Sequence, residues 1–169
     1  MIEVSIGDVA AADYPAIPPL LAQLGYPTDA DRVGRRIERV LAAGGRVLVA
    51  RAGQLPLGLA AVAFVPLVHH DDELCRITAL VVAGHARGQG IGRQLVALVE
   101  QLALERACLR LEVTSADHRA PAHAFYRSLG FSERPRRFIK QLRATDRDAT
   151  APAADPNPAP ITGERPAIL

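Results

Sequence analysis

The sequence predicts an α/β fold in which a mixed, mostly antiparallel sheet carries helices on both faces. Three β-rich runs lie over residues 46–51, 57–65 and 74–82, and the connections between them are too short for parallel crossovers. Apolar residues then recur at helical spacing over residues 91–102, ahead of a fourth run at residues 109–114. Because this helix has the length of a crossover, we expect the fourth run to lie parallel to the third.

The chain begins with a short predicted strand and a predicted helix. Apolar and polar side chains alternate over residues 2–6, as is typical of a strand. Residues 14–24 predict a helix, because Pro18 and Pro19 suit its first turn and Gly25 suits its C-terminal end.

Three further elements complete the predicted domain. A second helix is expected between Asp29, which can cap its N-terminus, and Gly44, which ends it. A short helix over residues 120–129 ends at Gly130, and residues 131–142 can supply one or two final strands.

Composition divides the chain into a domain of residues 1–143 and a tail of residues 144–169. The tail contains five prolines, several alanines and no aromatic residue, which predicts a flexible Pro/Ala-rich segment.

The net charge is +2 and the basic residues are scattered, which argues against a nucleic-acid partner. No apolar run reaches the roughly 18 residues of a membrane span, and the first residues lack the features of a signal peptide. We therefore expect a cytoplasmic protein without a membrane partner.

A glycine-rich turn joins the third β-rich run to the long helix. Backbone N–H groups at a helix N-terminus attract an anion, glycines allow its close approach, and Arg87 and Arg93 add positive charge. A pyrophosphate is therefore the expected ligand. The turn lacks the lysine that a P-loop requires, so nucleotide hydrolysis is not expected. A dinucleotide-binding fingerprint would need a glycine at the position of Arg93, although Glu112 lies at a suitable distance for a ribose contact. The turn follows an antiparallel meander and not the first strand of a βαβ unit, which argues against a dinucleotide site. A turn used only for packing is the remaining alternative.

Two sequence motifs lie in this turn and in the short helix that follows the fourth run. The segment Arg87-Gly88-Gln89-Gly90-Ile91-Gly92 has the pattern Gln/Arg-x-x-Gly-x-Gly/Ala, and Tyr126 shortly precedes the pair Gly130-Phe131. Together they resemble the two hallmarks of the GNAT superfamily of N-acetyltransferases, and the order of elements over residues 1–142 also fits that family. The resemblance implies a GNAT-like fold and acetyl-CoA as the co-substrate.

The resemblance also implies which residues bind acetyl-CoA. Backbone amides of the glycine-rich turn would hold the pyrophosphate. The pantetheine arm would pair like an extra strand with the end of the third β-rich run, in a slot opened where the third and fourth runs splay apart. Arg119 stands where many relatives carry an asparagine that contacts this arm, so it is not assigned to the site. The implied cofactor-binding residues are Leu80, Val81, Val82, Arg87, Gly88, Gln89, Gly90, Ile91, Gly92 and Arg93.

The implied reaction is the direct transfer of an acetyl group to a primary amine while both substrates are bound. Tyr126 occupies the position that in this family protonates the departing thiolate, and a tyrosine packed at a helix end is the alternative interpretation. Glu73, Glu112, His85 and a water chain are all candidates for the base. The alternative function is a non-catalytic acyl-CoA-binding or interaction module.

The loop over residues 69–73 contains two histidines and three acidic residues. Adjacent loop residues rarely converge on one ion, so no metal site is expected. A solvated acidic loop, or attraction of a cationic amine, explains the composition. Cys75 and Cys108 are expected to be small buried apolar residues. The acceptor is expected to be a small-molecule or peptide amine. The resemblance also allows for a homodimer, because dimers are common in the family.

Overall fold

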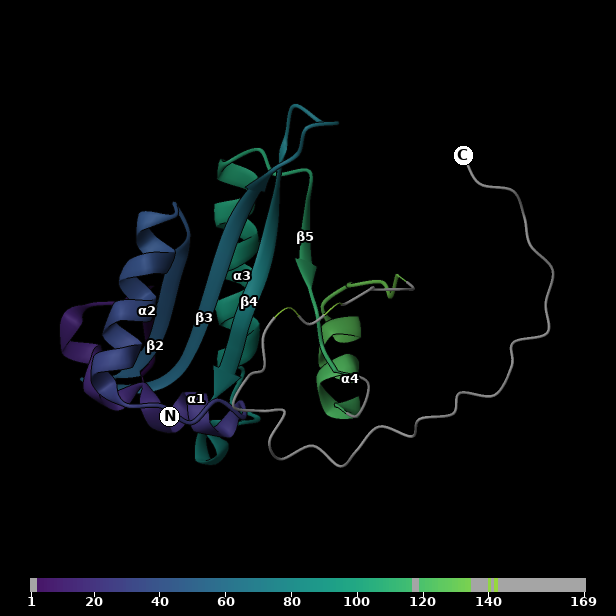
Figure 1. The fold of residues 1–169 in the computed structure, drawn as a ribbon. Coiled ribbons are helices and arrows are strands. Elements are labelled where there is room, and N and C mark those ends of the chain that lie inside the picture. The colour runs from purple at the N-terminus through teal and green to yellow at the C-terminus, as the bar shows by residue number, and fades with distance from the viewer. Residues whose placement is uncertain (1–2, 117–118, 135–139, 141, 143–169) are drawn as a thin grey trace, which may run out of the picture. The chain divides into compact units, whose positions relative to one another are not determined.

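The computed structural model describes residues 3–116, 119–134, 140 and 142, and residues 1–131 form one compact unit. Figure 1 shows its elements. The strands are β1 (Ser5–Asp8), β2 (Arg46–Ala52), β3 (Leu55–Pro66), β4 (Glu73–Val82) and β5 (Arg110–Val113). The α-helices are α1 (Pro18–Gln23), α2 (Ala30–Ala42), α3 (Ile91–Glu105) and α4 (Ala120–Ser128), and the short 3-10 helices are η1 (Ala11–Ala16) and η2 (Gly84–Ala86).

The sheet has the predicted mixed topology. Its strands follow the order β1-β2-β3-β4-β5. Antiparallel pairing joins β1 to β2, β2 to β3 and β3 to β4, whereas β5 runs parallel to β4. The chain reaches β5 through the crossover helix α3, which is the connection that a parallel pair requires. The prediction of four β-rich runs, with the last parallel to the third, is therefore confirmed.

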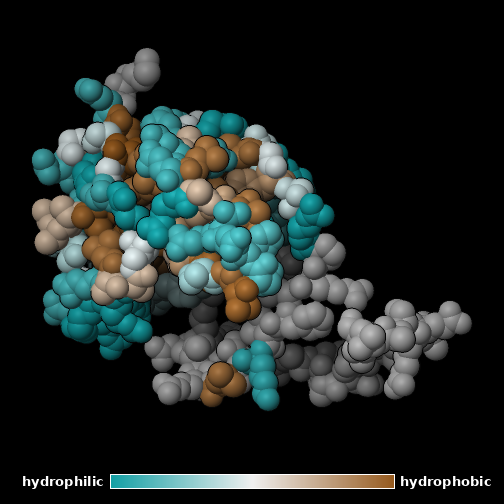
Figure 2. All heavy atoms as spheres, turned by 90° about the horizontal axis from the view of Figure 1, so that it is seen from above, coloured by the Kyte–Doolittle hydropathy of each residue, from teal (hydrophilic) through white to brown (hydrophobic). Residues whose placement is uncertain are grey.

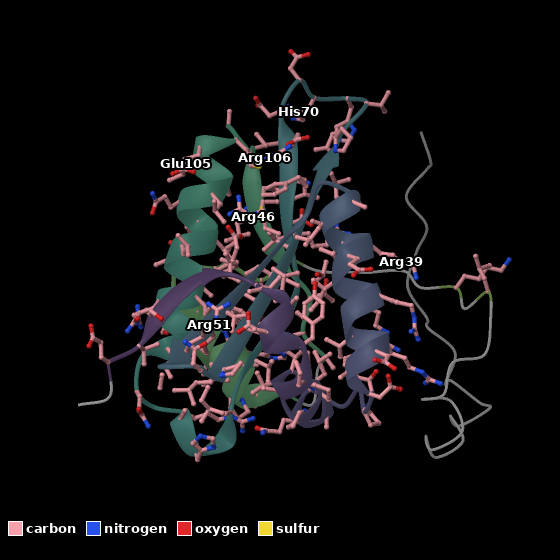
Figure 3. The ribbon with its side chains drawn as sticks, turned by 90° about the vertical axis from the view of Figure 1, so that its left-hand side faces the viewer. Arg39, Arg46, Arg51, His70, Glu105 and Arg106 are labelled. Carbon is pink, nitrogen blue, oxygen red and sulfur yellow. The ribbon has the colours of Figure 1, made fainter. Side chains whose placement is uncertain are left out.

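Helices cover both faces of the sheet, and Figure 3 shows α3 on one side and α2 on the other. On α3, Ile91, Leu95 and Val99 are at most 1% exposed, which confirms the predicted apolar stripe. The other face is covered by α2, which packs against β2 and η1. The backbone N–H of Arg32 donates to the Asp29 carboxylate at 2.8 Å, so Asp29 caps α2 as predicted.

The prediction of one helix over residues 14–24 is wrong. The segment forms η1 and then α1, which begins at Pro18. Pro15 lies inside η1 and lacks the N–H that a continuous α-helix would use, so the chain starts a new helix at the next proline pair. Gly25 has a φ of +92° and ends α1 as predicted.

A buried ion pair joins η1 to β2. Asp13 is only 4% exposed, and the Arg51 Nε donates to its Oδ1 at 2.7 Å. The Arg51 Nη2 also contacts the Asp13 Oδ2, which accepts the Ala10 backbone N–H at 2.7 Å as well. The hydrogen bond from Arg51 lowers the pKa of the Asp13 carboxyl despite its burial. Figure 3 marks Arg51 on the sheet.

Two predictions fall largely outside the described residues. These are the final strands over residues 131–142, of which 135–139 and 141 are not described, and the tail from residue 144. In the described part of the chain, no helix has the length and apolar character needed to cross a membrane. On the face shown in Figure 2, hydrophobic residues are interspersed with hydrophilic ones.

Candidate active site

The first feature of the site is an open edge of β4. The pairing of β4 with β5 ends at Ile77 and Val113, whereas β4 continues to Val82. Among the strands of the described chain, none pairs with residues 78–82 on the side where β5 departs. The strand β5 thus ends where β4 continues, which leaves an edge of β4 to which an extended ligand can hydrogen-bond.

The backbone groups along this edge point toward the opening. The Ala83 N–H donates to the Leu57 carbonyl on β3 at 2.8 Å. Alternate residues of an antiparallel strand turn their N–H and C=O groups to opposite edges. The polar backbone groups of Val82 and Leu80 therefore face away from β3, toward the side that β5 has left.

A β-bulge lies at the point where the pairing between β4 and β5 ends. Ala61 pairs with Ala79, but the next residue, Val62, pairs with Ile77, so Thr78 is an extra residue in β4. The Thr78 hydroxyl donates to the Ala61 carbonyl at 3.1 Å. Thr78 was not singled out in the sequence, because a bulge depends on pairing with a neighbouring strand.

The glycine loop lies at the other end of this edge and leads into α3. Gly88 and Gly90 have φ values of +76° and +81°, a left-handed conformation that favours glycine. Gly90 is the N-cap residue of the 15-residue helix α3 and provides no side-chain cap. The first N–H groups of α3 and the positive end of its dipole are therefore available to an anion.

Arg87 links this loop to the open edge. Its Nε donates to the Val82 carbonyl at 3.1 Å. The Gln23 side-chain oxygen, at the end of α1, accepts the Gly84 N–H at 2.9 Å and lies 3.5 Å from the Arg87 Nη2. Gln23 therefore fixes the loop from a segment far away in the sequence, and sequence reasoning missed it.

Gly92, the third glycine of the motif, serves packing. A Cβ at this position would lie 3.3 Å from the Phe125 ring on α4 and 3.7 Å from the Val82 side chain. The absence of a side chain lets α4 approach the start of α3. Arg93 adds a link between the same helices, because its Nη2 lies 3.4 Å from the Ser128 hydroxyl.

Tyr126 lies on α4 between two other aromatic rings. Its ring centroid is 5.3 Å from that of Phe125 and 5.5 Å from that of Phe131, both in edge-on geometry. Burial raises the pKa of the Tyr126 phenol, and the positive charge of Arg119 acts in the opposite direction. A phenol is protonated at neutral pH even at its ordinary pKa, and burial shifts the pKa of Tyr126 further in that direction.

Arg119 joins the start of α4 to the end of α1. Its Nη2 donates to the Leu24 carbonyl at 2.8 Å. The link connects helices that follow different strands of the sheet, and it places the Arg119 charge close enough to affect Tyr126. The structure thus gives Arg119 a positioning contact, although the sequence left it outside the site.

Two of the candidate bases are occupied by ion pairs. The two carboxylate oxygens of Glu112 accept hydrogen bonds from Arg110 at 2.7 Å and from Arg76 at 3.0 Å. The bond from Arg110, more than the one from Arg76, lowers the pKa of Glu112, which makes this carboxylate a weaker base. Glu73 pairs with Arg106 at 2.9 Å. Within the residues that the structure describes, no group of three His, Cys, Asp or Glu side chains is arranged to hold a metal ion.

Comparison with known proteins is consistent with this geometry. A model of the acetyltransferase (GNAT) family matches residues 14–131. The aminoalkylphosphonate N-acetyltransferase of Salmonella typhimurium is 36% identical over 75 residues, which are 44% of this chain and 49% of that protein. The chain therefore matches about half the length of this curated relative.

Solved structures share the fold. A protein of Bacillus halodurans C-125 described as a transcriptional regulator has a TM-score of 0.72 at 25% identity, over 83% of this chain and 100% of that one. The structure of AAC(6')-Iy in complex with the bisubstrate analogue CoA-S-monomethyl-acetylneamine has a TM-score of 0.71 at 18% identity, over 84% and 99% of the two chains.

Proposed function

We propose, since the chain belongs to the acetyltransferase (GNAT) family, that it is an N-acetyltransferase that moves the acetyl group of acetyl-CoA directly to a primary amine. The observation that carries this proposal is the open edge of β4 beside the glycine loop. The pairing of β5 ends at Ile77, and the edge then runs to Val82 and the start of the loop. A phosphate-bearing ligand with an extended arm matches both features at once.

The donor would lie along this edge with its pyrophosphate at the loop. The backbone amides of residues 87–93 would hold the pyrophosphate, with Gly88 and Gly90 allowing close approach. The arm would pair with residues 80–82, and the acyl end would then lie toward Thr78. Arg87 adds a positive charge beside the start of the arm. The 18%-identical neighbour whose complex contains a CoA analogue supports a CoA-shaped donor on this fold.

The chemistry requires an activated acyl group and two proton movements. Acetyl-CoA supplies a thioester, whose C–S bond breaks as the new C–N bond forms. We assign Tyr126 as the donor of the proton that the departing sulfur takes up, since a phenol carries its proton at neutral pH. The amine releases its proton to a base, for which Glu73, His85 and a water chain are the candidates. Glu112 is the weaker candidate, because hydrogen bonds from its two arginine partners lower its pKa.

The acceptor and the domain boundaries belong to the same proposal. The Salmonella relative is named for an aminoalkylphosphonate, which is a small amine and supports a small-molecule acceptor. The catalytic domain would consist of residues 1–143, with residues 144–169 as an appended Pro/Ala-rich tail.

Release of free CoA in the presence of a panel of amines tests the function. We expect release that depends on one class of amine, with an acetylated product detected by mass spectrometry and only a slow background when the amine is omitted. A protein that binds acetyl-CoA but releases no CoA with any amine would instead be the non-catalytic acyl-CoA-binding module.

A further inference from the structure

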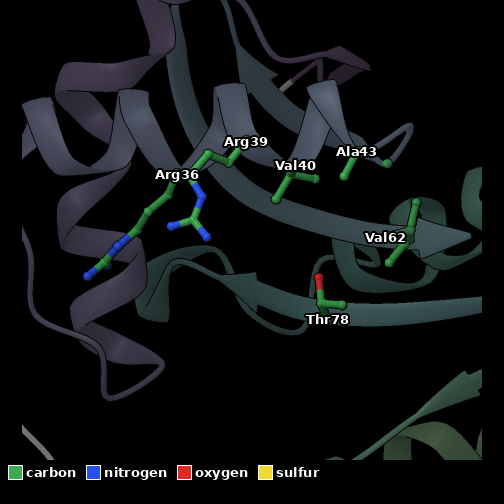
Figure 4. Close-up of a pocket in the computed structure, with 8 residues that line it drawn as sticks. Arg36, Arg39, Val40, Ala43, Val62 and Thr78 are labelled. Carbon is green, nitrogen blue, oxygen red and sulfur yellow. The ribbon is translucent and has the colours of Figure 1, made fainter. Parts of the chain in front are cut away.

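A pocket on the face of the sheet covered by α2 leads to an inference about the acceptor. The pocket has a volume of about 370 Å³ and lies between the C-terminal half of α2 and strands β3 and β4. Figure 4 shows Arg36 and Arg39 on α2 above the strands that carry Val62 and Thr78. Its lining includes Arg36, Arg39, Val40, Val62 and Thr78.

The position of Thr78 connects this pocket to the open edge of β4. Thr78 is the bulged residue of β4 and the first residue beyond the last pair with β5. A donor bound with its pyrophosphate at the glycine loop would extend along β4 from Val82 toward Thr78. Its acyl end would then arrive beside the residue that lines the pocket. The pocket is therefore in the place where the second substrate of a direct transfer must bind.

The charge of the pocket is positive. Its lining includes two arginines and no acidic residue. A neighbouring hollow of about 330 Å³ is lined by Arg32, Arg35, Arg36 and Arg39, which follow one another along α2. In the described part of the chain Arg32 forms an ion pair with Asp29, whereas neither Arg36 nor Arg39 forms one. Two arginines in the lining of a small cavity favour an anionic group and repel a cationic one.

We propose that the acceptor is a small primary amine that also carries an anionic group, a phosphonate, phosphate or carboxylate, which Arg36 and Arg39 bind while the amine faces Thr78. This inference rests on the proposed acetyl transfer. The apolar side chains of Val40 and Val62 leave room for a short aliphatic link between the two ends. Amines with a second positive charge, such as polyamines, would meet the two arginines and be rejected.

Three amines that differ in their second group test the proposal. 2-Aminoethylphosphonate, β-alanine and propylamine present a phosphonate, a carboxylate and no charge, and kcat/KM is measured for each at saturating acetyl-CoA. We expect at least one anionic amine to exceed propylamine by about tenfold or more, as one charge-assisted contact would give. The comparison of phosphonate with carboxylate then identifies the anion.

Matched variants assign the preference to the pocket. Arg36→Gln and Arg39→Gln should each reduce the ratio of kcat/KM for the anionic amine to that for propylamine by about tenfold. Arg35→Gln removes the same charge from the same helix. Arg35 lines the neighbouring hollow but not the pocket, so this variant should change the ratio by much less than tenfold. An equal ratio in all four proteins, or a parental preference for propylamine, would overturn the inference.

Direct binding separates this inference from the proposed function. Calorimetric titration of 2-aminoethylphosphonate and of β-alanine into the CoA-bound protein reports the anion site without turnover. Binding weakened by Arg39→Gln, with no acetylation of any amine, would support the anion site and contradict the transferase. Acetylation of propylamine without measurable binding of either anion would support the transferase and contradict the anion site. Saturable binding of an acidic peptide or an oligonucleotide with neither small anion bound would also contradict it.

Discussion

Replacing Gly90 with valine separates anion binding by the glycine loop from its structural role. Gly90 has a φ of +81° at the N-cap of α3, and a Cβ there would lie 4.0 Å from its nearest neighbour, the Gln94 amide. The added Cβ therefore overlaps no atom of the protein, and the loss of stability should be mainly the backbone strain of about 1–3 kcal/mol. Acetyl-CoA affinity should fall much further, because the branched side chain occupies the space through which a phosphate reaches the loop amides. Loss of two charge-assisted hydrogen bonds at about 1.5–3 kcal/mol each gives about 3–6 kcal/mol, a rise in Kd of a hundredfold or more.

A matched glycine provides the control for this strain. Gly53, in the β2–β3 turn, also has a left-handed φ, +57°, and a Cβ there would meet nothing within 4 Å. Gly53→Val should lose stability to a similar extent in thermal unfolding but bind acetyl-CoA with the parental Kd in isothermal titration calorimetry. The reasoning is refuted if Gly90→Val keeps the parental Kd, or if both variants lose affinity to the same degree.

Three further predictions concern the proton donor, the buried ion pair and the tail. Tyr126→Phe keeps the ring but removes the proton, so the single-turnover rate should fall by about 10² with little change in acetyl-CoA affinity. An unchanged rate would contradict the assigned role. Asp13→Ala should lower the free energy of unfolding by about 3 kcal/mol in urea at neutral pH, because Arg51 loses its buried partner. Because the pKa of Asp13 is lowered from 3.8 in the folded state, the difference in free energy of unfolding between the parent protein and this variant should shrink as the pH falls below 3.8. A difference that does not change with pH would argue against the charged pair. Removal of residues 144–169 should leave Tm and kcat unchanged, and a marked fall in Tm would show that the tail packs on the domain.

Most of the fold was predictable because its elements are periodic within short windows. The apolar spacing of α3 identified a buried stripe, and the short connections between β2, β3 and β4 required antiparallel pairing. The failure over residues 14–24 has a local cause. The apolar residues there suit a helix, but Pro15 interrupts the hydrogen-bond ladder, so the segment divides into η1 and α1.

The candidate site was predictable only where its residues are contiguous. The glycine loop was identified because the end of a strand, the turn and the start of a helix follow one another in the chain. Gln23 accepts a hydrogen bond from the backbone N–H of Gly84, which lies 61 residues further along the chain. Nothing in the sequence around Gln23 indicates this contact. Arg36 and Arg39 look like the solvated face of a helix until β3 and β4 are placed beneath them.

One local irregularity of β4 accounts for both halves of the proposed active site. The extra residue Thr78 sits opposite the step from Ala61 to Val62 on β3, and a bulge bends its strand and increases its twist. The four-residue strand β5 pairs with β4 only as far as Ile77, directly before that bend. Beyond it the edge of β4 is open on the β5 side, and Thr78 itself lines the arginine-flanked pocket under α2. A donor arm arriving along β4 from the glycine loop and an acceptor entering beneath α2 would therefore meet at the same residue, which is the geometry that direct transfer requires.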